Sequence, residues 1–282
     1  MITMLKLLPI LLLLGCSHSA PQPTPSVAEQ LAPLRNTYLD LITETQDEHG
    51  FIGSDRCDSL LFTGLASTGG LVVDITAARD DDGRWYRRPG RDCLLRGESR
   101  STISRDMVWG LLWHAWAARD LQLLEDFWAF GESRNWRIGD SDGTPEGASR
   151  TIMSFNIVST TARLIAKLGG EEHRERLIPL IVSGKAEGFS AHLEMLALGL
   201  NKRINHTPWG TVAKINNYAR RSPNNLIFQA IAGHYQTSLD LARGYPQDRL
   251  PNNTDWCEEW PPQREDDDTG QTPCAAPKLH SG

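Results

Sequence analysis

One stretch of this chain, residues 105–118, is apolar on nearly every side, and it constrains the fold more than any other. Its apolar side chains recur at intervals of three and four residues, and three tryptophans form a second stripe beside them: Met107, Val108, Leu111, Leu112 and Ala115, then Trp109, Trp113 and Trp116. This spacing is typical of an α-helix. Ser101 or Ser104 is a suitable cap, because a serine hydroxyl accepts from an unpaired first-turn N–H. We expect this helix to lie between other elements.

A second helix follows after a turn at Arg119 and Asp120, with a narrower apolar face, so the two predict an antiparallel hairpin with an inner and an outer member. Further helices are expected at 27–45, 59–70, 151–168, 171–183, 189–200, 208–220 and 225–243, with a short apolar segment at 71–79. Turn formers at 79–93 predict a β-turn or small β-hairpin. Because alternation of apolar and polar residues never runs far, the fold class is all-α.

The amino-terminal end predicts the compartment. Residues 1–15 contain one lysine and the run LLPILLLL, which is too short to span a bilayer and is typical of a signal peptide. Leu13-Leu14-Gly15-Cys16 resembles the lipobox of bacterial lipoproteins, in which the cysteine is lipidated. The resemblance implies a membrane anchor at Cys16 in the cell envelope, at the outer membrane since Ser17 follows. The alternative is an ordinary secretory signal cleaved near Ala20.

The other four cysteines, Cys57, Cys93, Cys257 and Cys274, suit an oxidising compartment. Proximity in the sequence favours the pairs Cys57–Cys93 and Cys257–Cys274, although four cysteines allow three pairings. A zinc site is the weaker alternative, because the cysteines and histidines lack metal-ligand spacing. No metal or cofactor is expected.

Composition divides the chain into a leader at 1–15, a Pro/Ser-rich tether at 16–26, one helical-hairpin domain at 27–250 and an irregular acidic tail at 251–282. The formal net charge is −6, and losing Lys6 with the leader makes it −7. A chain this acidic is not expected to bind nucleic acid.

The order of helical hairpins, with the fragments DEHGFIGSDRCDSLLFTGL, SRDMVWGLLW and NWRIGDSDG, resembles the α/α-toroid of six-hairpin glycosidases and related polysaccharide lyases. The chain has four to five hairpins where a complete toroid has six. The resemblance implies a toroid-like arc, with a site in the loops at one end of its inner helices.

Several charged and aromatic residues lie in the matching loops. Hydrolysis of a glycosidic bond needs one protonated and one ionised carboxyl group, aromatic faces stack on sugars, and arginines hold acidic groups. The catalytic candidates are Asp106, Asp58 and Asp140, and the substrate-binding candidates are Glu98, Arg100, Arg105, Trp136, His206 and Trp209.

Structural interpretations compete with these roles. Asp106 and Asp58 also suit the positive end of a helix dipole, Trp136 and Trp209 suit packing, and His114 suits a hydrogen-bonded place in the core. His192 with Glu194, and His206, are candidates for a base or for metal ligands, without metal spacing to support them. Two acidic runs, at 80–82 and 265–268, lack the ligand spacing of a calcium loop and are expected to be solvated.

The sequence therefore predicts an envelope lipoprotein that binds a carbohydrate polymer and cleaves it with loop carboxylates. The alternative is a non-catalytic envelope lipoprotein that holds a glycan or a partner protein on the same face.

Overall fold

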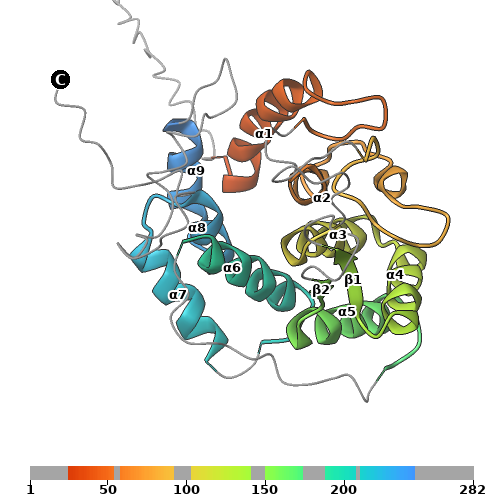
Figure 1. The fold of residues 1–282 in the computed structure, drawn as a ribbon. Coiled ribbons are helices and arrows are strands. Elements are labelled where there is room, and N and C mark those ends of the chain that lie inside the picture. The colour runs from red at the N-terminus through yellow and green to blue at the C-terminus, as the bar shows by residue number, and fades with distance from the viewer. Residues whose placement is uncertain are drawn as a thin grey trace, which may run out of the picture.

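A computed structural model describes residues 25–53, 58–91, 103–140, 150–173, 188–207 and 210–244. Within these ranges the fold is all-α, as predicted: nine α-helices, one 3₁₀ turn and one two-stranded sheet (Figure 1). The helices are α1 (Val27–Thr43), α2 (Ser59–Ser67), α3 (Arg105–Ala118), α4 (Leu121–Ser133), α5 (Phe155–Leu168), α6 (Gly188–Arg203), α7 (Thr211–Arg221), α8 (Leu226–Ala232) and α9 (Tyr235–Gly244), with η1 at Ile75–Ala78.

Helix α3 lies at the centre of the main core, as its apolar circumference predicts. It packs against α2, α4, α5 and α6. Seven of its fourteen residues are buried, Trp109 among them, and Trp113 donates its indole N–H to the carbonyl oxygen of Leu196 on α6, 3.2 Å away. His114 is hydrogen-bonded, as predicted, because its Nδ1 lies 2.8 Å from Ser67 Oγ on α2.

Helices that are consecutive in the sequence also contact one another in the fold. From α2 onward each packs against the next, and α1 packs against α9, so the two ends of the helical region lie side by side (Figure 1). Arg243 on α9 donates to Gln30 Oε1 on α1 at 2.7 Å. A second, smaller core forms between α6, α7 and α8, around Tyr218 and Phe228. None of the helices in the described ranges has the length and apolar character to cross a bilayer.

Helices α2 and α3 run parallel and nearly touch. Gly64 lies against Gly110 in mid-helix: a Cβ on Gly64 would lie 2.3 Å from the carbonyl oxygen of Gly110. Toward the carboxyl ends, Ser67 meets His114. Since the contacts advance in the same direction along both helices, the two amino ends lie at the same end of the pair.

Two expected helices differ from the structure. Residues 151–168 do not form one helix: β2 (Arg150–Ile152) pairs antiparallel with β1 (Arg137–Asp140), and α5 begins only at Phe155. Ser154 sets that start, because its backbone is extended and its hydroxyl accepts from the N–H of Ile157. Residues 225–243 are likewise two helices, since Gly233 has φ 95° and ends α8.

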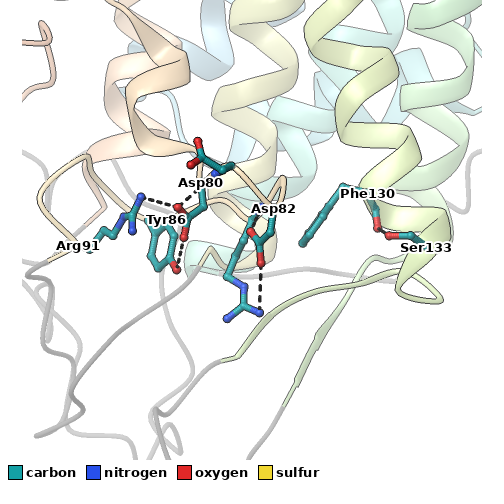
Figure 2. Close-up of polar contacts among 8 residues, drawn as sticks. Asp80, Asp82, Tyr86, Arg91, Phe130 and Ser133 are labelled. Atoms are coloured by element: carbon teal, nitrogen blue, oxygen red, sulfur yellow. Dashed lines mark hydrogen bonds and ion pairs between the residues drawn. The ribbon is translucent and has the colours of Figure 1, made fainter.

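The turn expected at 79–93 is present within the residues described up to 91. Arg79 and Trp85 form an antiparallel bridge, and Gly83 has φ 86° at the tip. Asp80 accepts from Arg91 at 2.7 Å and from the Tyr86 hydroxyl at 3.2 Å (Figure 2). This acidic run is therefore tied to its own turn by hydrogen bonds. Of the helix expected at 171–183, residues 174–183 lie outside the described residues, and 171–173 are not helical.

Candidate functional site

The candidate site lies where the amino ends of α2 and α3 meet. Asp58 is the residue before α2, and Asp106 lies in the first turn of α3. Both are partly exposed. Because the helices run parallel, the chain brings these two predicted carboxylates to one end of the helix pair.

Arg87 joins the two helix ends. Its side chain is buried, with 7% of its surface exposed. One guanidinium nitrogen lies 3.1 Å from Asp58 Oδ1, and the other donates to Ser104 Oγ at 3.2 Å. The backbone of Arg87 also contacts α2, since its carbonyl oxygen accepts from the N–H of Leu60 at 2.9 Å. Asp58 and Asp106 are thus separated by one guanidinium and one hydroxyl.

Ser104 completes the cluster and departs from its predicted role. It stands at the N-cap position of α3, yet its side chain makes no capping hydrogen bond. Its hydroxyl instead donates to Asp106 Oδ1 and accepts from Arg87. The expectation that this hydroxyl caps the helix was wrong, because a buried guanidinium and a carboxylate are stronger partners than a backbone N–H.

Neighbouring residues hold the cluster in place. Trp85 and Tyr86 are buried beside Arg87, and the N–H of Ile103 donates to the carbonyl oxygen of Trp85 at 3.3 Å. The segment 85–87 therefore contacts the first turn of α2 and the residue that lies two before α3. We call Asp58, Arg87, Ser104 and Asp106 the amino-end cluster.

The chemistry of the cluster follows from its contacts. A guanidinium stays charged, so it holds the paired Asp58 as an ionised acceptor. Asp106 has no partner besides Ser104 among the described residues, and part of its side chain faces solvent. Two helix amino ends also favour negative charge here. The cluster can accept hydrogen bonds from a ligand through Asp106.

The other predicted site residues do not join the cluster. Arg105 lies between Ser104 and Asp106 and is exposed. Asp140 lies in β1, where its backbone pairs with Arg150. Some predicted residues lie outside the described residues altogether: Glu98, Arg100, Trp209, Cys16, Cys57, Cys93, Cys257 and Cys274.

Trp136 packs against the protein, and its ring contacts that of Trp128. The two ring centroids lie 4.8 Å apart in an edge-to-face arrangement. A Cβ on Gly131 would lie 2.7 Å from the Trp136 ring, and His173 stacks on Trp128 at 4.0 Å. These contacts favour packing over ligand stacking as the role of Trp136.

His206 follows α6, and its backbone N–H donates to the carbonyl oxygen of Asn201 at 2.8 Å. Burial, with the nearby charge of Arg163, lowers the pKa of His206.

On α6, Glu194 accepts from Lys214 at 2.6 Å and from the Tyr218 hydroxyl. His192 is buried, and burial lowers its pKa to about 4. Within the described ranges, no group of three or more His, Cys, Asp or Glu side chains is placed to hold a metal ion.

Arg87 and Ser104 were not predicted as site residues. Ser104 was singled out only as a cap, and Arg87 is one of four arginines in eight residues, with nothing in the sequence to mark it as the buried one.

Comparison of the chain with family models, with curated proteins and with solved structures finds no match.

Proposed function

We propose that this protein is a lipid-anchored envelope protein whose helical domain binds a carbohydrate polymer at the amino-end cluster. The observation that carries the proposal is the part-exposed Asp106 carboxylate, held in place by Ser104 and without another partner among the described residues. Sugar hydroxyls donate well to an ionised carboxylate of this kind.

The arrangement of the helices supports a toroid-like domain as part of this proposal. Successive helices contact one another, α1 closes against α9, and α2 and α3 run parallel as inner helices of neighbouring hairpins would. Such an architecture collects loops and helix amino ends on one side, which suits a site at the amino ends of α2 and α3.

Cleavage of the polymer is the second candidate function. It is favoured by the link between Asp58 and Asp106 through Arg87 and Ser104, since glycoside hydrolysis needs two carboxyl groups flanking one bond. Binding is the better-supported function, because Asp58 is already paired with the buried Arg87.

The experiment compares the purified wild-type protein with Asp106→Asn on a panel of polysaccharides, measuring retention and the release of reducing ends. Asp40→Asn is the matched control, since it removes one exposed carboxylate from α1. Binding should weaken in Asp106→Asn alone, with its melting temperature nearly unchanged. Release of reducing ends by the wild type, lost in Asp106→Asn, establishes cleavage. Equal binding by all three proteins refutes the assignment of Asp106, and retention on no polymer refutes the function.

The anchor is tested separately. Replacing Cys16 by Ser should abolish the incorporation of labelled fatty acid, because only the thiol of Cys16 accepts the lipid. Labelling of the Cys16→Ser protein at the wild-type level would overturn lipidation at Cys16, and a wild-type protein without label would indicate an ordinary secretory signal.

A further inference from the structure

The charges of the amino-end cluster restrict the class of polymer that it can hold. Acidic polysaccharides are recognised by arginine, whose forked guanidinium binds a carboxylate through two parallel hydrogen bonds. The buried arginine of this cluster directs one terminal nitrogen to Asp58 at 3.1 Å and the other to Ser104 at 3.2 Å. Because Arg87 is buried and both terminal nitrogens contact protein groups, it does not present that fork to a ligand.

The local charges also balance. Asp58 and Asp106 contribute two negative charges, and Arg87 contributes one positive charge. The amino ends of α2 and α3 each act as roughly half a positive charge. Together these charges nearly cancel within the cluster, from which Arg105 is left out. The cluster itself therefore attracts a charged sugar little, whether the sugar is acidic or basic.

Arg105 favours a different class of ligand, an acidic polymer. It is the neighbour of Asp106, and its side chain is exposed. A fully solvated guanidinium attracts acidic polymers over long range, but salt screens that attraction within about 8 Å at physiological ionic strength. Binding that depends on Arg105 would therefore show a strong dependence on salt.

Resting on the proposed function, we infer that the polymer is uncharged and is held through sugar hydroxyls that donate to Asp106. Recognition of this kind depends on short-range hydrogen bonds to one carboxylate. It is insensitive to salt and indifferent to Arg105. It also explains why the cluster keeps an acceptor partly exposed while both terminal nitrogens of its buried arginine contact protein groups.

The test is affinity electrophoresis of the full protein in gels containing a neutral glucan, mannan or xylan, polygalacturonate, or chitosan. We expect retention by a neutral polymer, unchanged between about 0.05 and 0.5 M salt. Asp106→Asn should weaken that retention about tenfold, as loss of a hydrogen bond to a charged group does. Arg105→Gln should leave it unchanged.

Two other outcomes overturn the inference in distinguishable ways. Retention by polygalacturonate that is lost in Arg105→Gln or in high salt shows an acidic ligand and leaves carbohydrate binding intact. Retention by chitosan alone, lost in high salt, shows a basic ligand. If no polymer retains the protein, the proposed function itself fails, and the inference fails with it.

Discussion

Substituting Gly110 by Ala tests the close parallel packing of α2 and α3, on which the amino-end cluster depends. A Cβ at position 110 would lie 2.6 Å from the carbonyl oxygen and 2.7 Å from the Cα of Leu61. Both are backbone atoms of α2, so no side chain can rotate away. Ordinary contact begins near 3.4 Å, so the helices must separate by about 0.8 Å.

The cost of that separation exceeds the gain in helix propensity. Ala in a helix interior is better than Gly by about 0.5–1 kcal/mol. Overpacking a dense core costs about 1–3 kcal/mol and sometimes more, and here two rigid helices must move. We therefore expect Gly110→Ala to lose about 3 kcal/mol, which lowers the melting temperature of a domain of this size by about 6–12 °C.

Thermal and urea unfolding followed by circular dichroism measure this loss. Gly244→Ala is the matched control, because the last residue of α9 has open space around its Cα, and we expect it to be neutral or slightly stabilising. Gly64→Ala should behave like Gly110→Ala, since its Cβ would meet the backbone of α3. A Gly110→Ala protein that melts within about 2 °C of the wild type would refute the close approach of the helices.

Three further perturbations have defined outcomes. Arg87→Ala should lower the free energy of unfolding by about 2–4 kcal/mol in a urea melt, because it removes a buried guanidinium that links two helix ends; a loss below about 1 kcal/mol contradicts that role. Burial lowers the pKa of His192 to about 4, below its ordinary 6.5, so the unfolded chain binds the extra proton first. Stability should then fall by about 3 kcal/mol as pH drops from 6.5 to 4, and His192→Phe, which keeps a ring against Phe228, should show a smaller fall; equal pH dependence in both proteins rules this out. Trp136→Ala should cost about 2–4 kcal/mol by chemical denaturation, because the ring packs on Trp128, and an unchanged midpoint would indicate a surface role instead.

Local patterns were enough to predict much of the helical framework. The apolar circumference of 105–118 predicted a central helix, and α3 lies in the main core, packed against α2, α4, α5 and α6. Gly169 stopped the predicted helix at 168, and α5 ends there with Gly169 at φ 99°. Gly233 carries the same signal within 225–243, and the single helix predicted there was wrong because α8 ends at this glycine. The strands β1 and β2 were missed because three or four residues show too little alternation to be distinguished from a helix start.

The candidate site depended on information that the sequence holds only indirectly. Asp58 and Asp106 could be named as candidates because each precedes or begins an apolar helix, and that is a local property. Their meeting through Arg87, 29 residues from Asp58, required α2 and α3 to run parallel. Nothing local to either helix specifies the direction of packing. Gly64 and Gly110 let the two backbones approach closely, and the direction is seen only from the further contact of Ser67 with His114.

By itself, then, the sequence determined that the chain is mostly helical and that 105–118 is a buried helix, because these properties depend on neighbours three or four positions away. Only the tertiary structure decided that Ser104 contacts a guanidinium instead of capping its own helix, that Trp136 packs on Trp128, and that Arg87 is buried and paired with Asp58. Those outcomes depend on which surfaces meet. After the helices have packed, a polar group or ring contacts the strongest partner within reach.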